Sequence, residues 1–411
     1  MALNRLCPMI AALLLAFPAC GQHEPAVPAP DTEALRFISG SPVRIAAELS
    51  DGLILVQGRV NDSEPAWFAF DTGATINVLD EAFARQIGLD LSDRTKDERS
   101  GRESVRAHGL ALHLGGLELV GQTAHVMSLT ELELFVGRPF AGIFGYELLR
   151  HAVVELDYAG RTLVVHQPGA FVYAGSGKTV PLEVVGKWPV LSARLEQEGR
   201  APVENKLILD SGSVSAMSLM VGGLASRTVD VPVSAGIGGV GAGNARVGRI
   251  SALTLGPFTF RNPVVMFPPA AATEDPDYLS KAIASTGIGL VGAPVCSRFR
   301  LVFDYPGRSL LMEPAAGIDA PFELDMSGAI LMSASLQFDA FRVLAVIKDS
   351  PAWQAGLEVG DTIVAIDGRP ASEIPLAQVR ELFRTEGLRF TLRVQRAAGP
   401  VEVVLVTRRL I

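Results

Sequence analysis

The sequence predicts a mostly β protein that is built from two related halves and followed by a smaller α+β domain. Short runs of Val, Leu, Ile and Phe alternate with Gly-bearing turns at close spacing through most of the chain, a pattern typical of β-barrels and sandwiches. An internal repeat divides this region into two copies. At 411 residues the chain is also too long for a single hydrophobic core, so we expect two or three cores.

The composition is that of a folded globular protein, with 48% hydrophobic and 19% charged residues. The formal net charge is -8, and the chain contains no run of Lys and Arg that would follow a phosphate backbone. Nucleic acid is therefore not an expected partner.

The N-terminus has the features of an export signal in residues 1–20. A short charged start precedes the apolar stretch Leu6–Phe17, which is too short for a permanent membrane span. Residues 17–21, Phe-Pro-Ala-Cys-Gly, resemble a bacterial lipobox, and this resemblance implies acylation and membrane attachment through Cys20. Plain cleavage is the alternative. We expect a protein on the periplasmic side of the bacterial envelope, with residues 21–35 as a flexible Pro-rich tether.

Cysteine usage agrees with this processing. Cys7 lies in the signal and Cys20 lies at the cleavage point, so Cys296 is the single cysteine that remains inside the mature chain. An intramolecular disulfide is therefore excluded, and we expect Cys296 to be a buried apolar residue.

The repeat is clearest where residues 142–165 align without gaps to residues 289–312, with seven identities in 24 positions. The identical pairs are Gly142/Gly289, Gly145/Gly292, Asp157/Asp304, Tyr158/Tyr305, Gly160/Gly307, Arg161/Arg308 and Leu163/Leu310. Upstream, each copy contains an apolar strand that ends in Asp-Thr/Ser-Gly. These motifs are Asp71-Thr72-Gly73-Ala74 and Asp210-Ser211-Gly212-Ser213.

Each motif is followed further on by two hydrophobic residues and a glycine, at residues 143–145 and 290–292. This arrangement resembles the pepsin and retropepsin families of aspartic peptidases, and in particular retropepsin-like bacterial peptidases, over residues 36–316. The resemblance implies two β-barrel lobes related by a pseudo-twofold axis, residues 36–170 and 175–316, with the active site between them.

The chemistry of such a site explains why two aspartates are needed. Peptide hydrolysis without a metal or a covalent intermediate requires a base that activates water and an acid that protonates the substrate. Two adjacent carboxyls that share one proton supply both roles. The sequence therefore predicts Asp71 and Asp210 as one catalytic pair, with no cofactor and no metal.

Neighbouring residues are candidates for support of this pair. Gly73 and Gly212 permit tight turns that bring main-chain N–H groups to the carboxylates, and Gly145 and Gly292 permit the close crossing of a neighbouring strand. By resemblance, Thr72 and Ser211 would form hydrogen bonds across the pseudo-twofold axis.

The two motifs differ at one place, where the first has Ala74 and the second has Ser213. A hydroxyl at this position would favour the charged form of its own aspartate. We therefore expect Asp210 to be the more readily ionised side and Asp71 to hold the shared proton more often.

Two segments are flap candidates, residues 100–109 with Gly101 and residues 236–243 with Gly238 and Gly239. Neither segment contains the Tyr that pepsin-like flaps often carry, and the Gly-rich second segment is not followed by the Lys-Ser/Thr of a phosphate loop.

Other interpretations of these residues are weaker. A single Asp-Ser-Gly is often an ordinary turn, but two copies inside a duplication favour catalysis. A serine-nucleophile interpretation of Ser211 lacks the order of a triad. The six histidines form no zinc motif. The repeated Asp157-Tyr158 and Asp304-Tyr305 precede Gly-Arg turns, which indicates a structural role.

The last ninety residues have a different pattern. Apolar residues at 376, 379, 382 and 383 predict an amphipathic helix over residues 376–384, after strands near 341–347 and 360–368. The segments Ser-Pro-Ala at 350–352 and Gly-Asp-Thr-Ile at 360–363 resemble bacterial PDZ domains over residues 318–411. This resemblance implies binding of a C-terminal peptide, with Gly328, Ala329 and Ile330 in the loop that captures its carboxylate. A module that only packs against the peptidase and stiffens it is the alternative.

Together these features predict an aspartic endopeptidase that hydrolyses envelope proteins or peptides and has a PDZ module for peptide recognition. The alternative is a non-catalytic peptide-binding envelope lipoprotein that retains the fold.

Overall fold

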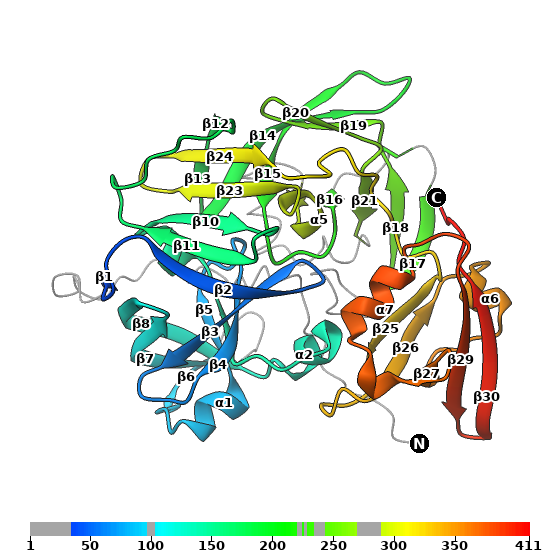
Figure 1. Ribbon diagram of the computed structural model, residues 1–411. Coiled ribbons are helices and arrows are strands. Elements are labelled where there is room, and N and C mark those ends of the chain that lie inside the picture. The colour runs from blue at the N-terminus through cyan, green and yellow to red at the C-terminus, as the bar shows by residue number, and fades with distance from the viewer. Residues whose placement is uncertain (1–33, 97–102, 220–223, 226–227, 234–242, 269–288) are drawn as a thin grey trace.

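The computed structural model describes residues 34–96, 103–219, 224–225, 228–233, 243–268 and 289–411. Two β lobes lie side by side, and a smaller domain of strands and short helices packs beside them (Figure 1). The predicted mostly β class and the two-part organisation of the β region are confirmed.

The elements of lobe 1 are β1 (Ala34–Phe37), β2 (Val43–Ser50), β3 (Leu53–Val60), β4 (Ala66–Phe70), β5 (Asn77–Asp80), α1 (Glu81–Gln86), β6 (Asp93–Lys96), β7 (Glu103–Leu114), β8 (Leu117–Met127), α2 (Thr130–Val136), β9 (Gly142–Phe144), α3 (Tyr146–Leu149), β10 (Val153–Asp157) and β11 (Thr162–His166).

The elements of lobe 2 are β12 (Lys178–Pro181), β13 (Glu183–Val185), β14 (Trp188–Glu196), β15 (Val203–Leu209), β16 (Met217–Leu219), β17 (Thr228–Val233), β18 (Gly243–Arg249), β19 (Ala252–Leu255), β20 (Phe258–Arg261), β21 (Val264–Phe267), β22 (Gly289–Val291), α5 (Ala293–Cys296), β23 (Phe299–Asp304) and β24 (Ser309–Pro314).

The C-terminal domain contains β25 (Ala329–Ser333), β26 (Phe341–Val346), α6 (Pro351–Gln354), β27 (Thr362–Ile366), β28 (Arg369–Pro370), a 3-10 helix (Ala371–Glu373), α7 (Leu376–Leu382), β29 (Arg389–Arg396) and β30 (Gly399–Val406).

The two lobes repeat one strand pattern. In lobe 1, β9 lies between β4, to which it is parallel, and β5, to which it is antiparallel, and β5 in turn runs parallel to β8. In lobe 2, β22 lies in the same way between β15 and β16, and β16 runs parallel to β21. The duplication is therefore one of topology as well as sequence.

A shared sheet joins the lobes through the repeated segments. The antiparallel strands β10 and β23 pair directly, and Glu155 faces Val302, its own counterpart in the repeat. The pseudo-twofold axis passes between these two residues. The hairpins β10–β11 and β23–β24 therefore form the middle of one continuous sheet, which fixes the lobes relative to each other.

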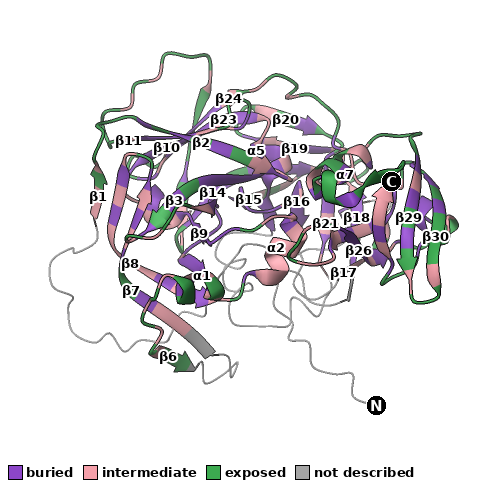
Figure 2. Cartoon of the chain, turned by 60° about the horizontal axis from the view of Figure 1, so that its bottom comes forward, coloured by how far each residue is buried: buried purple, intermediate pink, exposed green. Residues whose placement is uncertain are grey.

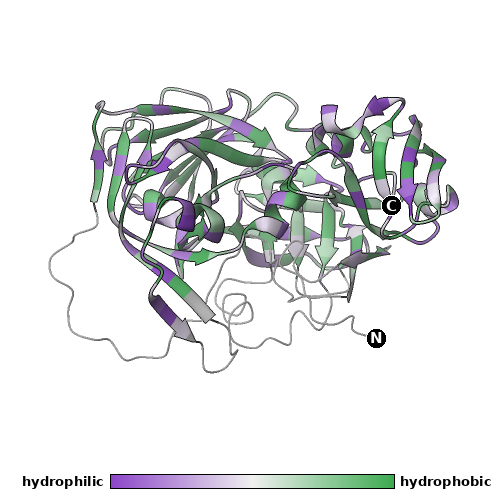
Figure 3. Ribbon diagram, turned by 90° about the horizontal axis from the view of Figure 1, so that it is seen from below, coloured by the Kyte–Doolittle hydropathy of each residue, from purple (hydrophilic) through white to green (hydrophobic). Residues whose placement is uncertain are grey.

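The hydrophobic core follows this joint. One buried cluster runs from strands of lobe 1 to strands of lobe 2, and the C-terminal domain has its own core, which extends from Ala329 to Leu405. The strands inside the lobes are largely buried (Figure 2), and hydrophobic residues gather on them (Figure 3). Cys296 lies in the main cluster, as expected for a buried apolar residue.

The linker between the main core and the C-terminal domain is held to lobe 2. The Arg298 guanidinium donates to the carbonyls of Ile318, at 2.7 Å, and Pro321, at 3.3 Å, and lies 3.6 Å from the centre of the Phe322 ring. Phe322 itself is part of the main cluster. The C-terminal domain expected from residue 318 thus begins with a segment that packs into the lobes.

The described residues contain the amphipathic helix predicted over residues 376–384 and shorter helices in both lobes. Residues 81–86 form α1, where the Asp80 side chain accepts a bond from the Phe83 amide at 3.0 Å, and residues 376–382 form α7. Helices α3 and α5 have only four residues each, too few to show helical periodicity in the sequence. Within the described part of the chain, no helix is long and apolar enough to cross a membrane.

Candidate active site

The two Asp-Thr/Ser-Gly motifs occupy equivalent places at the ends of β4 and β15, where the two lobes meet. The Asp71 amide donates to the Phe144 carbonyl of β9 at 2.9 Å, and the Asp210 amide donates to the Val291 carbonyl of β22 at the same distance. Both aspartates are buried. The parallel pairing of each motif strand with the strand from the repeat therefore sets the position of each carboxyl.

Gly145 and Gly292 let these strands pass close to the motifs, as predicted. A Cβ atom on Gly145 would lie 1.8 Å from the Asp71 carbonyl oxygen, and one on Gly292 would lie 2.2 Å from the Ser215 carbonyl oxygen. Neither approach is possible for a residue with a side chain. The backbone that follows each glycine begins a short helix, α3 or α5.

Thr72 and Ser211 join the two motifs by reciprocal hydrogen bonds. The Ser211 amide donates to Thr72 Oγ1 at 2.9 Å, and the Thr72 amide donates to Ser211 Oγ at 3.0 Å. Thr72 Oγ1 also donates to the Leu209 carbonyl at 2.7 Å. All of these groups are buried, so the cross-lobe bonds expected by resemblance are present.

Glycine amides reach the carboxyls from both motifs. The Gly73 amide donates to Asp71 Oδ1 at 2.8 Å, and the Gly212 amide lies 3.0 Å from Oδ1 of both Asp71 and Asp210. A Cβ on Gly73 would lie 2.6 Å from Asp210 Oδ1, and one on Gly212 would lie 2.4 Å from Asp71 Cγ. Each glycine therefore leaves room for the carboxyl of the opposite lobe.

Burial raises the pKa of both carboxyls. For Asp71, burial and then the negative charge of Asp210 hold the pKa well above its ordinary value. For Asp210, burial raises the pKa to about 6, although hydrogen bonds from Asp71 and from the main chain oppose the rise. Each Oδ2 is buried without a hydrogen-bond donor among the described residues. One proton shared between the carboxyls would satisfy both oxygens.

The Ser213 hydroxyl has a different hydrogen-bond partner from the one expected from the sequence. The Ser213 main-chain N–H, and not its hydroxyl, opposes the rise of the Asp210 pKa. The Ser213 hydroxyl instead accepts a bond from the Ser215 amide at 3.4 Å. Ala74 is buried, and its carbonyl accepts a bond from the Tyr146 amide at 3.0 Å. The side chains of Ala74 and Ser213 therefore form no hydrogen bond with either carboxyl among the described contacts.

A tryptophan adds a contact that sequence reasoning missed. Trp188, which is buried at the start of β14 in lobe 2, donates its indole N–H to the Gly73 carbonyl of lobe 1 at 2.9 Å. The next residue toward the N-terminus, Lys187, donates to the Thr75 carbonyl at 3.1 Å. No local pattern announces these contacts, because their partners lie more than 110 residues away.

The repeated Asp-Tyr pairs support the turns that follow them, in agreement with the structural interpretation. Asp157 Oδ1 accepts a bond from the Gly160 amide at 2.8 Å, and Asp304 Oδ1 accepts one from the Gly307 amide at 2.7 Å. Tyr158 and Tyr305 are buried, and burial holds the pKa of each phenol above its ordinary value.

The flap candidates Gly101, Gly238 and Gly239 lie outside the described residues. The strands on either side of each candidate form matching antiparallel pairs, β6 with β7 in lobe 1 and β17 with β18 in lobe 2. Cys20 also lies outside the described residues.

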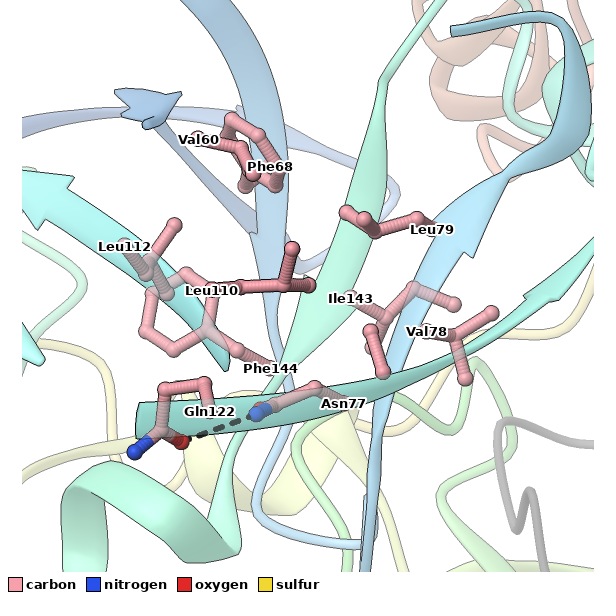
Figure 4. A pocket seen from close by; sticks show the side chains of 11 residues that line it. Val60, Phe68, Asn77, Val78, Leu79, Leu110, Leu112, Gln122, Ile143 and Phe144 are labelled. Carbon is pink, nitrogen blue, oxygen red and sulfur yellow. Dashed lines mark hydrogen bonds between the residues drawn. The ribbon is translucent and has the colours of Figure 1, made fainter. Parts of the chain in front are cut away.

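A small cavity of about 20 Å³ lies inside lobe 1 and not at the lobe junction (Figure 4). Its lining is apolar except for Asn77 and Gln122, which hydrogen-bond to each other at 3.0 Å. None of the residues that line it is titratable, so this cavity offers no acid or base. Among the residues that the structure describes, no cluster of His, Cys, Asp and Glu could hold a metal ion.

The PDZ loop candidates surround a side chain of the same chain. Gly328, with φ of +75°, precedes β25, Ala329 is the first residue of that strand, and Ile330 pairs with Ala345 of β26. The Asp325 carboxylate accepts bonds from the amides of Ser327, at 2.8 Å, and Gly328, at 2.9 Å. This contact was not expected from the sequence.

Comparison with known families agrees with both parts of this structure. A family model described as aspartyl protease matches residues 56–148, which include the Asp71 motif and β9. A PDZ domain model matches residues 342–396. No curated protein matches the chain. The first lobe is therefore similar to aspartyl proteases, the second lobe repeats its strand topology, and the C-terminal domain is similar to PDZ domains.

Proposed function

We propose that this protein is an aspartic endopeptidase in which Asp71 and Asp210 together activate one water molecule. The observation that carries the proposal is the pairing of two buried carboxyls from equivalent motifs, bridged by the Gly212 amide. Their raised pKa values favour a pair that holds one proton. Such a pair contains an acid and a base at the same site.

The reaction follows from this shared proton. The ionised carboxylate removes a proton from water, whose oxygen forms a bond with the carbonyl carbon of the substrate, while the protonated carboxyl donates to the carbonyl oxygen. The resulting diol returns a hydroxyl proton to one carboxylate, and the other carboxyl protonates the amide nitrogen. The C–N bond then breaks and leaves an acid, an amine and the singly protonated pair.

The rigid surroundings suit this chemistry. The bonds between Thr72 and Ser211 fix the lobes, and the glycine amides hold the carboxyls without adding a charge of their own. We also propose that the substrates are envelope proteins or peptides and that acylated Cys20 attaches the protein to the membrane. This part rests on the sequence of residues 1–21.

The decisive experiment compares Asp71→Asn and Asp210→Asn with the natural protein on a mixture of denatured proteins, with and without an aspartic-peptidase inhibitor. Each single variant should lose hydrolysis completely and remain folded by circular dichroism, because one pair acts as a unit. Asp304→Asn is the matched control, since an amide oxygen can still accept the Gly307 bond. Retention of about half the activity in either variant would refute a shared site. A folded natural protein that binds peptides without cleaving them would favour the non-catalytic alternative.

A further inference from the structure

The side of the C-terminal domain formed by β25 and α7 is in contact with lobe 1 of the same chain. PDZ domains add a peptide as an extra strand at a sheet edge and capture its terminal carboxylate on backbone N–H groups. Among the described strands, β25 is the end strand of its sheet and pairs with β26 alone, and α7 lies beside it. Both the edge of β25 and the amides of its preceding loop have intramolecular partners.

The amides of the loop are engaged by Asp325. Besides the Ser327 and Gly328 amides, its Oδ1 accepts the Ser327 hydroxyl at 2.5 Å. The Ala329 amide donates to Ser327 Oγ at 3.0 Å. Three successive N–H groups at the start of β25 are thus satisfied from within the loop, and a carboxylate of the chain stands where the terminal carboxylate of a ligand would accept its bonds.

The strand edge is engaged by Arg380 of α7. One guanidinium nitrogen donates to the Leu331 carbonyl of β25 at 2.7 Å, and the other pairs with Asp51 in the β2–β3 turn of lobe 1. The side chains of Arg380 and Asp51 are only 14% and 5% exposed, so this ion pair is buried at the domain contact. The guanidinium also lies 4.3 Å from the centre of the Phe135 ring in α2.

Helix α2 of lobe 1 covers the same edge. It contacts β25 and lies beside it and α7 (Figure 1). Immediately after this helix, a Cβ on Gly137 would lie 2.8 Å from Leu376 Cβ at the start of α7. The C-terminal domain therefore meets lobe 1 through the two elements, β25 and α7, between which a PDZ ligand would bind.

The same helix packs against the Asp71 motif. Val136 of α2 belongs to a small core with Ala74, and the partly buried Leu132 and Ile76 pack against it. The Ser50 hydroxyl, next to Asp51, donates to the Val136 carbonyl at 3.2 Å. A continuous chain of packed groups thus leads from the groove of the C-terminal domain to the backbone that holds Asp71.

We propose that the PDZ domain of this protein is an internal brace whose partner is lobe 1 of its own chain. Helix α2 and Asp51 occupy the groove that a free peptide C-terminus would need, and the docked domain holds the first half-site in place. A peptide could enter only if the Arg380–Asp51 pair and α2 moved away. The inference concerns docking, so it holds whether or not the proposed hydrolysis is correct.

The test measures amide hydrogen exchange and peptide binding in the purified full chain. Arg380→Ala and Asp51→Asn should each speed exchange in residues 130–136 and 71–76 on the order of a hundredfold, because loss of one partner leaves the other charge buried and unpaired. The effect of the double variant should be clearly smaller than the sum of the two single effects, since the two residues form one contact. Arg393→Ala, which removes an exposed arginine from β29 of the same domain, is the matched control and should change neither segment.

Peptide binding is measured by fluorescence anisotropy with labelled peptides that have either a free or an amidated C-terminus. The natural chain should show no saturable binding of either form. If Arg380→Ala does not fold, Arg380→Lys serves in its place, because it keeps the charge and loses the two-pronged geometry. Saturable binding of the free-acid form alone by the natural chain would overturn the proposal. The proposal would also be overturned if amide exchange in Arg380→Ala and in Asp51→Asn were equal to that in Arg393→Ala.

Discussion

Replacement of Thr72 by Ala should weaken the joint between the two half-sites more than any other single hydroxyl change in the motifs. Thr72 Oγ1 accepts the Ser211 amide at 2.9 Å and donates to the Leu209 carbonyl at 2.7 Å, and all three groups are buried. A buried amide left without an acceptor costs about 1–3 kcal/mol, and an ordinary hydrogen bond contributes about 1 kcal/mol. The free energy of unfolding should therefore fall by about 2–4 kcal/mol, a large part of the stability of a typical domain.

Denaturant unfolding of Thr72→Ala and Thr72→Ser, followed by tryptophan fluorescence, measures this effect. Thr72→Ser keeps the hydroxyl and loses only a methyl group, so it should unfold close to the natural protein. Because the same bonds align the two carboxyls, kcat on a peptide substrate should fall in Thr72→Ala and remain near normal in Thr72→Ser. Equal stability of the two variants would show that the hydroxyl does not join the lobes as the structure indicates.

Three further predictions concern protonation and attachment. The acidic limb of the pH–rate profile is expected near the Asp210 pKa of about 6. Ser213→Ala should not move this limb, because alanine keeps the main-chain N–H. An upward shift would restore a role for the hydroxyl. The pKa of Asp210 is about 6 in the folded protein and 3.8 in its ordinary state, which represents the unfolded chain. This difference adds to the free energy of unfolding in full below pH 3.8, and the contribution is lost as the pH rises through about 6. Asp210→Asn should therefore flatten the loss of thermal stability between about pH 4 and pH 7, and an unchanged slope would contradict the burial argument. Cys20→Ser should release the protein from the membrane fraction, and unchanged fractionation would refute acylation at this residue.

The sequence alone predicted the duplication and the positions of the two motifs. Both depend on local pattern: an apolar strand that ends in Asp71 or Asp210, and a glycine further on that must pass a neighbouring backbone. The mostly β fold and the PDZ domain follow from patterns of the same kind. At Gly145, for example, the neighbouring backbone leaves no room for a Cβ atom, so the requirement is visible in the sequence as a glycine.

Contacts between distant segments could not be predicted from local sequence patterns. The Trp188 bond to Gly73 and the Arg380 pair with Asp51 join residues that are 115 and 329 positions apart. A single Trp, Arg or Asp forms no local sequence pattern that would identify its partner. The partner is set only when the lobes and the C-terminal domain pack together. The sequence therefore determined which residues could form the site, and the tertiary structure decided what holds them in place.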